Sequence, residues 1–244
     1  MITATRIRRA SSAALTAAGF AAAAAGVGPL SATAVAQPAP ACPDVEVVFA
    51  RGTNEAPGVG ETGQAFVNSL NARLSTPVAV YGVNYPATLD FPTAIDGVAD
   101  AANHIESLTA TCPDTQIVLG GYSQGAAVAA YTTFNAVPPG FLLPPNLNGP
   151  MPADVAQHVA AVALFGTPDP FILNLLDRNA PSIAVGPLYA DKTIQLCAPG
   201  DPVCQPGAFD RSAHSAYKTN GMTDQAAQFV VDHLHGAAAG AGTQ

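Results

Sequence analysis

Short apolar runs alternate with longer segments of helical period along most of this chain. The runs are rich in β-branched residues and predict strands at residues 45–50, 78–83, 116–121, 159–165 and 193–197. They are nearly continuous apolar runs rather than alternations of apolar and polar positions. This is typical of strands in a parallel sheet that is covered on both faces.

The segments between these runs carry apolar residues at helical spacing. Residues 61–74 and 93–110 each have an apolar stripe, a third helix is predicted to start at Ser123, and Thr223 can cap a last one. Strands joined by right-handed helical crossovers predict an α/β fold. We expect a small three-layer sandwich with a five-stranded parallel sheet and no second domain.

Two connections are unusually long. Residues 136–153 contain six prolines around an apolar segment at 141–143, which predicts an irregular surface loop. An apolar flap is the alternative, because long loops without secondary structure are often functional. Residues 167–190 are predicted to cover the core with Phe171, Ile172, Leu173, Leu175 and Leu176.

The first 36 residues have the composition of a secretory signal peptide. Arg6, Arg8 and Arg9 precede an apolar stretch at 13–30, and Ala34-Val35-Ala36 fits a small-residue cleavage site. A transmembrane anchor is the alternative, but the stretch is rich in Ala and Gly and only weakly hydrophobic. We therefore predict a secreted protein, extracellular or associated with the cell wall.

The predicted division of the chain is a signal peptide at 1–36, a linker at 37–41, one folded domain at 42–235 and a flexible tail at 236–244. Removing three of the 9 Lys and Arg while keeping all 17 Asp and Glu moves the formal net charge from −8 to about −11. Such an acidic surface repels phosphate backbones and anionic headgroups. Nucleic-acid binding and charge-driven membrane docking are therefore disfavoured, and neutral substrates are favoured.

Four cysteines in an exported chain predict two disulfides, for which three pairings are possible. Cys197 and Cys204 enclose a turn-rich segment that suits a local bridge, which leaves Cys42 to pair with Cys112. A zinc site is the competing interpretation. It is disfavoured because the cysteines are neither closely paired nor next to a histidine at ligand spacing.

A nucleophile motif lies between the predicted strand at 116–121 and the helix that follows it. Gly121-Tyr122-Ser123-Gln124-Gly125 has the G-x-S-x-G pattern, in which a strained turn lifts the serine off the end of the strand. The glycines on either side clear space for this turn. The pattern is common by chance, but its position between a strand and a helix of small residues favours Ser123 as a nucleophile.

A serine nucleophile needs a histidine to accept its proton and an acid to orient that histidine. In this fold the order along the chain is Ser, Asp or Glu, then His. His214, in a loop after the last predicted strand, fits best. The other histidines precede Ser123, enter a strand or lie in the terminal helix; they are His104, His158, His233 and His235.

Asp201 is the favoured acid. It follows the strand at 193–197 and lies between Cys197 and Cys204, whose bridge would hold its carboxylate still. Asp169 is the rival, because it also follows a predicted strand and related folds differ in which strand bears the acid.

A tetrahedral intermediate requires two N–H donors, one from the residue after the nucleophile and one from the loop after an earlier strand. Gln124 is the first. In the loop after residues 45–50 we expect Thr53 to be the second. The alternative is a plain turn that caps the helix at 61–74, with Arg51 only as a structural ion-pair partner.

These residues resemble the cutinase family over nearly the whole chain after residue 36, most closely the secreted cutinase-like esterases of actinobacteria. The motifs that carry the resemblance are Ala50-Arg51-Gly52-Thr53-Asn54-Glu55, Gly120-Gly121-Tyr122-Ser123-Gln124-Gly125-Ala126, Cys197-Ala198-Pro199-Gly200-Asp201-Pro202-Val203-Cys204 and His214-Ser215-Ala216-Tyr217. The resemblance implies a minimal α/β-hydrolase fold and the same triad, oxyanion hole and disulfides. It departs from plant-pathogen cutinases, which have Ser at position 53, and in the proline-rich loop.

We therefore expect a monomeric serine esterase without a cofactor or an obligate protein partner. Its substrate would be a small or polymeric neutral ester with short to medium acyl chains, bound at a lipid or polyester surface and cleaved through an acyl-enzyme. The acyl chain would be flanked by Tyr85, Leu89, Phe91, Ala208 and Phe209. The alternatives are a lipid acyltransferase or phospholipase with the same triad, and a non-catalytic lipid-binding surface protein.

Overall fold

The computed structural model describes residues 41–139 and 141–241, with side chains up to residue 234. The predicted signal peptide and nearly all of the predicted linker lie outside the described residues. So does the end of the predicted tail, at 242–244.

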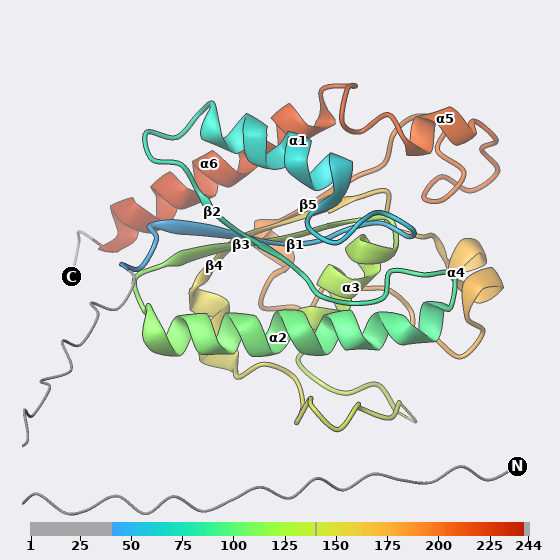
Figure 1. Ribbon diagram of the computed structural model, residues 1–244, viewed down its shortest axis with the longest axis horizontal. Helices are drawn as coiled ribbons and strands as arrows, with labels where there is room; N and C mark the ends of the chain where they lie inside the picture. The colour runs from blue at the N-terminus through green and yellow to red at the C-terminus, as the bar shows by residue number, and fades with distance from the viewer. Residues whose placement is uncertain (1–40, 140, 242–244) are drawn as a thin grey trace, which may run out of the picture. The chain divides into compact units, whose positions relative to one another are not determined.

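The predicted five-stranded parallel sheet is confirmed. Its spatial order is β2-β1-β3-β4-β5, and every neighbouring pair is parallel (Figure 1). The strands are β1 (Val45–Ala50), β2 (Ala79–Gly82), β3 (Gln116–Tyr122), β4 (Val159–Phe165) and β5 (Thr193–Leu196). Because all five run in one direction, their carboxyl ends form a single edge on which functional residues can gather.

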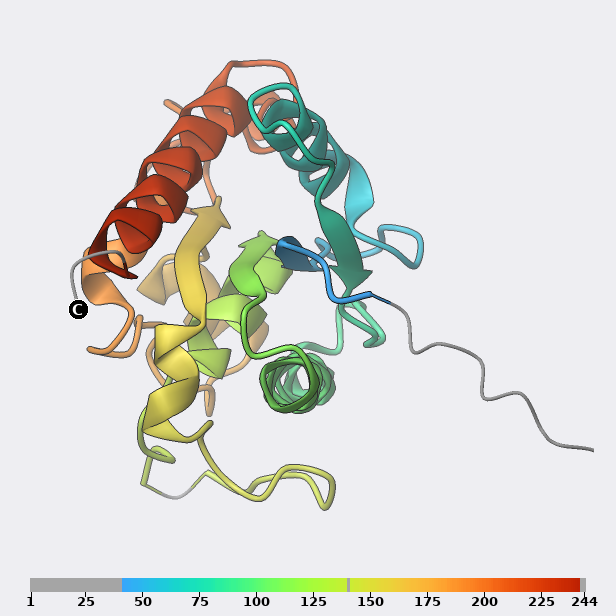
Figure 2. The ribbon, with the colours of Figure 1, turned by 90° about the vertical axis from the view of Figure 1, so that its left-hand side faces the viewer.

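Two pairs of helices cover the sheet. One face carries α1 (Gly60–Asn71) and α6 (Met222–Ala241), and the other carries α2 (Ala94–Thr111) and α3 (Gln124–Thr132). Seen end-on, the sheet lies between these two layers (Figure 2). Side chains of β1 alternate between the layers: Val47 and Phe49 pack under α1 and α6, and Val48 packs under α2 and α3. Both faces of the strand are therefore buried, which explains why its sequence is apolar at every position except Glu46.

The segment at 167–190 differs from its prediction, because it contains a helix that exposes most of its large apolar side chains. Helix α4 (Pro170–Leu176) begins at Asp169, whose carboxylate accepts a hydrogen bond from the amide of Ile172. Leu173 is buried, but Phe171 is 75% exposed and Leu175 is 73% exposed. Helical spacing turns Phe171 and Leu175 away from Leu173. The expectation that this segment covers the core is therefore wrong for Phe171 and Leu175, whereas Ile183, Val185 and Tyr189 further along it do pack against the core.

Helix α6 continues to Ala241, which lies within the predicted tail at 236–244. The reason lies in the Ala-rich sequence there, because Ala has the highest helix propensity. The remaining elements are short: η1 (Phe91–Thr93), η2 (Ala153–Gln157), η3 (Ala190–Lys192) and α5 (Arg211–His214). In the part of the chain that the structure describes, no helix has both the length and the apolar character needed to cross a membrane.

Two disulfides link the cysteines. Cys42 pairs with Cys112, which ties the start of β1 to the end of α2. Cys197 pairs with Cys204 across the turn that follows β5.

Candidate active site

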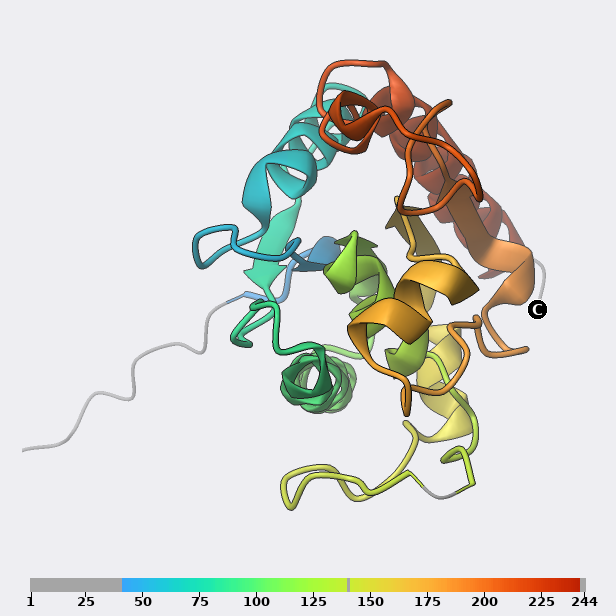
Figure 3. The ribbon, with the colours of Figure 1, turned by 90° about the vertical axis from the view of Figure 1, so that its right-hand side faces the viewer.

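Ser123 lies on a strained turn between β3 and α3, at the carboxyl edge of the sheet (Figure 3). Its backbone has φ 55° and ψ −119°, a conformation that side-chain-bearing residues rarely adopt. The neighbouring glycines make this turn possible: a Cβ on Gly121 would lie 2.0 Å from the carbonyl oxygen of Gly125, and one on Gly125 would lie 2.0 Å from that of Ala50. The motif therefore folds as the predicted elbow.

His214 lies opposite Ser123. Its Nε2 is 2.9 Å from Ser123 Oγ, and its Nδ1 is 2.8 Å from Asp201 Oδ2. Sequence reasoning placed His214 in a loop, whereas it ends the short helix α5, which starts where Asp210 accepts a hydrogen bond from the amide of Ser212. The hydroxyl of Tyr122 donates to the carbonyl of His214 at 2.5 Å. Backbone and ring are thus both held in place.

Asp201 is completely buried, and its carboxylate accepts several hydrogen bonds. Oδ1 accepts from the amide of Val203 at 2.8 Å, and Oδ2 accepts from the hydroxyl of Tyr217 at 2.6 Å as well as from His214. Burial raises the pKa of Asp201, but the hydrogen bonds from His214, Tyr217 and Val203 outweigh it and hold the pKa below its usual value. An ionised carboxylate is the form that can orient the imidazole.

Tyr217 is a site residue that sequence reasoning missed. Its hydroxyl donates to Asp201 and accepts from the amide of Ala198 at 2.9 Å, so this buried phenol joins the catalytic loop to the end of β5. It stood in the quoted motif His214-Ser215-Ala216-Tyr217. That proximity to His214 was the only signal in the sequence.

The rival candidates lie in other places. Asp169 caps α4, and no hydrogen bond or ion pair links its carboxylate to a histidine among the described residues. His104 pairs with Glu46 and stacks on Tyr81. His158 and His233 bond backbone carbonyl oxygens, and the side chain of His235 lies outside the described residues.

The two predicted oxyanion donors are the amide of Thr53, in the loop after β1, and the amide of Gln124, at the start of α3. Gln124 is the first residue of α3, where an N–H has no partner within the helix. In the described part of the chain, neither this N–H nor that of Thr53 is hydrogen-bonded. Both are therefore available to an oxygen atom of a ligand.

The residues expected to flank the acyl chain divide into two groups. Tyr85 and Phe91 are buried in the core beside α2 and α3, so the expectation that they line a substrate slot is wrong. Leu89 and Phe209 are 73% and 91% exposed, and Ala208 is half-buried.

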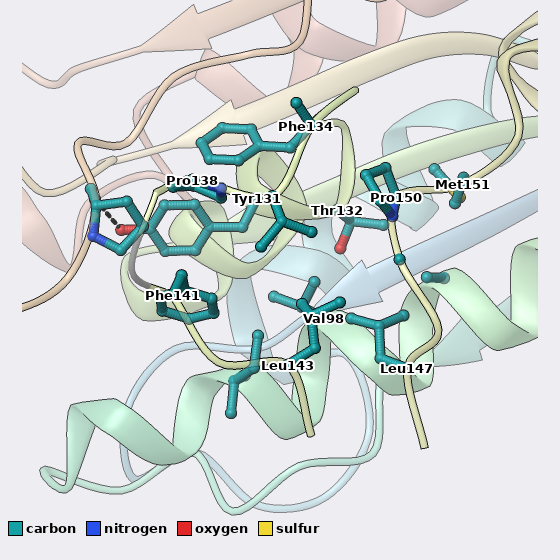
Figure 4. Close-up of a pocket in the computed structure, with 16 residues that line it drawn as sticks. Val98, Tyr131, Thr132, Phe134, Pro138, Phe141, Leu143, Leu147, Pro150 and Met151 are labelled. Atoms are coloured by element: carbon teal, nitrogen blue, oxygen red, sulfur yellow. Dashed lines mark hydrogen bonds between the residues drawn. The ribbon is translucent and has the colours of Figure 1, made fainter. Parts of the chain in front are cut away.

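The proline-rich loop lies beside α2 rather than over Ser123. Together with α2 and the far end of α3 it lines a small apolar cavity of about 50 Å³, in which Val98, Tyr131 and Leu143 face one another (Figure 4). Cavities that admit a benzene-sized ligand measure about 150 Å³, so this one does not hold an acyl chain as it stands. Tyr131 is about 12 Å along α3 from Ser123 at 1.5 Å per residue. The alternative of an apolar flap over the site gains no support from this arrangement.

Among the residues described, no cluster of three His, Cys, Asp or Glu side chains is arranged to hold a metal ion.

The parallel sheet and the serine elbow at its carboxyl edge define an α/β-hydrolase-like protein. The sequence model of the cutinase family matches residues 41–234, and the chain belongs to this family. It is 48% identical over 176 residues to "Probable carboxylesterase Culp5" of Mycobacterium tuberculosis, covering 72% of this chain and 98% of that protein. It is 47% identical over 203 residues to "Phospholipase Culp4" of the same organism, covering 82% of this chain and 84% of that protein.

Solved structures agree with this assignment. Trichoderma reesei cutinase in complex with a phosphonate inhibitor is 34% identical with a TM-score of 0.57, and the match covers 79% of this chain and 77% of the other. An acetyl xylan esterase is 25% identical with a TM-score of 0.64, covering 80% of this chain and all of the other. The protein is a carboxylic ester hydrolase.

Proposed function

We propose that the protein is a serine esterase that works through an acyl-enzyme, with Ser123 as nucleophile, His214 as general base and Asp201 as the group that orients His214. The observation that carries this proposal is the unbroken hydrogen-bond chain from Ser123 Oγ through the imidazole to a buried carboxylate. The amides of Thr53 and Gln124 would form the oxyanion hole.

The reaction follows from these positions. As Ser123 Oγ bonds to the carbonyl carbon of the ester, Nε2 of His214 takes the hydroxyl proton, and the oxygen that becomes negative receives hydrogen bonds from Thr53 and Gln124. The C–O bond to the alcohol then breaks, and His214 gives its proton to the departing oxygen. Water attacks the resulting acyl-enzyme by the same sequence, which releases the acid and restores the proton on Ser123.

We infer that the substrates are neutral carboxylic esters with short to medium acyl chains, small or polymeric, presented at a lipid or polyester surface. The exposed Leu89 and Phe209 support an apolar substrate, and the acidic composition disfavours anionic ones. The two disulfides support export to an oxidising environment. We expect a monomer that needs no cofactor and no protein partner.

Replacing the nucleophile tests the proposal. Ser123→Ala should lower kcat on nitrophenyl esters by about 10⁴-fold or more and abolish labelling by a serine-reactive phosphonate, with an unchanged thermal transition. Asp201→Asn should lower kcat by up to about 10⁴-fold, because the imidazole loses the partner that sets its tautomer. Asp169→Asn is the matched control, since Asn also caps helices well. Full activity of Ser123→Ala would refute the proposal.

Phospholipid hydrolysis is a second candidate, favoured by the 47% identity to a protein named a phospholipase. A panel of nitrophenyl esters, a triglyceride emulsion and phosphatidylcholine vesicles would separate the two. Release of fatty acid from the vesicles at a rate similar to that on nitrophenyl esters would favour the phospholipase. Added acceptor alcohols in the same assays would reveal acyl transfer as ester products.

A further inference from the structure

Arg51 is a buried cation without a carboxylate partner. It follows β1 directly, and only 4% of its surface is exposed. The alternative role that the sequence suggested for Arg51 was an ion pair, but within residues 41–139 and 141–234 no carboxylate oxygen lies within ion-pair distance of its guanidinium. The ion-pair alternative is therefore wrong.

The guanidinium instead donates hydrogen bonds to backbone carbonyl oxygens on two loops. Nε donates to Glu55 at 2.9 Å within its own loop, and Nη2 donates to Tyr85 at 2.6 Å in the loop after β2. Nη1 adds a longer bond to Val83 at 3.3 Å. Arg51 thus holds the loop of Thr53 against the loop after β2.

Tyr85 returns the contact. Its hydroxyl donates to the carbonyl oxygen of Arg51 at 2.5 Å, and its ring lies 5.1 Å below the guanidinium carbon. The two residues therefore form a closed pair, in which each side chain binds the other's backbone. We call this pair the Arg51–Tyr85 clamp.

The clamp holds two strained residues together. Asn54 has φ 62° and Ala87 has φ 52°, and the amide of Asn54 donates to the carbonyl of Ala87 at 2.6 Å. Of the described residues, these two and Ser123 are the only non-glycine residues with positive φ. Strained backbone persists only where its surroundings fix it, and it gathers at functional sites.

Both expected oxyanion donors depend on these loops. Thr53 lies between Arg51 and Asn54, and the side chain of Gln124 donates to the carbonyl of Thr88 at 2.9 Å. A buried cation that binds only carbonyls carries a desolvation cost that an ion pair would offset, so stability alone is a poor reason to keep it. We propose that Arg51 is a positioning residue that, with Tyr85, fixes the amides of Thr53 and Gln124 for the oxyanion; this rests on the proposed function.

Four variants test this proposal on a soluble nitrophenyl ester, at a temperature well below each thermal transition. Arg51→Met should lower kcat by about 10²-fold with KM changed less than about 3-fold, because a donor displaced by about 1 Å loses its effect in the transition state. Arg51→Lys, which keeps the charge but not the fork of donors, should recover part of the loss. Tyr85→Phe should lose about 10-fold. Arg73→Met is the matched control, since Arg73 makes a surface ion pair with Asp224.

The rate of inactivation by a phosphonate gives an independent readout, because its phosphoryl oxygen occupies the oxyanion hole. We expect this rate to fall in proportion to kcat across the series, while the final stoichiometry of labelling stays at one per chain. Lower thermal stability with unchanged kcat and inactivation rate would reduce Arg51 to a structural role. Raised KM with unchanged kcat would also overturn the proposal.

If Arg51→Met does not fold, Arg51→Lys and Tyr85→Phe decide by the same criteria. Failure of the proposed function is distinguishable, because it would show as full activity in Ser123→Ala whatever the clamp variants do.

Discussion

Tyr217 is a single residue on which the state of Asp201 depends. Its hydroxyl supplies one of the hydrogen bonds that keep the pKa of Asp201 low, and its own pKa is raised by burial and by that bond. In Tyr217→Phe the carboxylate loses this donor and the amide of Ala198 loses its acceptor. We expect kcat to fall about 10-fold and the free energy of unfolding at pH 7 to fall by about 1–3 kcal/mol.

The loss of stability in Tyr217→Phe should depend on pH with a definite sign. A carboxyl whose pKa is lowered by folding stabilises the protein above its unfolded pKa of about 3.9, and this contribution disappears as the pH falls below that value. The difference in unfolding free energy between wild type and Tyr217→Phe, measured by urea unfolding, should therefore narrow as the pH falls below about 4. Tyr131→Phe is the control: its hydroxyl binds the carbonyl of Pro181, so its gap should stay constant. A gap of constant size in Tyr217→Phe would contradict the link to Asp201.

Among single residues, the sequence predicted those that belong to a known catalytic motif. It missed the roles of residues that depend on contacts in the folded protein. Ser123, Asp201 and His214 stood out because a motif and an order along the chain mark them, and the structure brings all three within hydrogen-bond distance. Tyr217 contacts Asp201, which is 16 positions away along the chain, and Arg51 contacts Tyr85, which is 34 positions away. Such pairings are set by the tertiary fold, and an isolated motif does not contain them.

The two disulfides act on different elements, and their removal should separate stability from activity. A disulfide stabilises the folded state by lowering the conformational entropy of the unfolded chain, and the effect grows with the length of the loop that it closes. The Cys42–Cys112 bridge, with a sequence separation of 70, should stabilise the fold by about 4.4 kcal/mol. The Cys197–Cys204 bridge, with a separation of 7, should stabilise it by about 2.4 kcal/mol. Cys42→Ser/Cys112→Ser should therefore melt earlier but keep wild-type kcat in the cold.

The short bridge encloses Asp201, so its loss should affect catalysis. Cys197→Ser/Cys204→Ser should stay folded at room temperature yet lose about 10²-fold in kcat, because a shift of about 1 Å in a triad member has an effect of that order. Thermal melts and initial rates on the same samples measure both quantities. Wild-type kcat in the short-loop variant would show that this bridge does not position the acid.

Secondary-structure elements were predictable where burial on both faces imposed one simple pattern. The strands were found within two residues because each is a short, mainly apolar run between helical segments, and the three central strands β1, β3 and β4 are buried between two helix layers. The residues of helix α4 were expected to cover the core because Phe171 and Leu175 look like core residues, and only the tertiary fold reveals that they face solvent. Exposed apolar side chains of this kind carry no local signal that separates them from buried ones.

At the scale of the whole molecule, the absorbance of the tyrosines can be used to follow unfolding. The chain has 6 Tyr and no Trp, so its near-ultraviolet absorbance comes mainly from phenols. All six pKa values are raised, chiefly by burial; that of Tyr81 is raised to about 12, and those of Tyr85, Tyr122, Tyr131, Tyr189 and Tyr217 are raised as well. Folding therefore favours the protonated phenol at every one of these positions.

The sign of the resulting pH dependence follows directly. A phenol whose pKa is higher in the folded than in the unfolded state stabilises the fold fully below the unfolded value of about 10, and this stabilisation is lost as the pH rises toward the folded value. Six such groups act together, so we expect stability to fall steeply between about pH 10 and pH 12. Phenolate absorbance at 295 nm should then rise in one cooperative step that coincides with loss of the far-ultraviolet helical signal. If instead the phenols titrate gradually near pH 10 while the protein stays folded, they are accessible to solvent. That result would contradict the burial of Tyr85, which holds the oxyanion loop, and of Tyr217, which binds the catalytic acid.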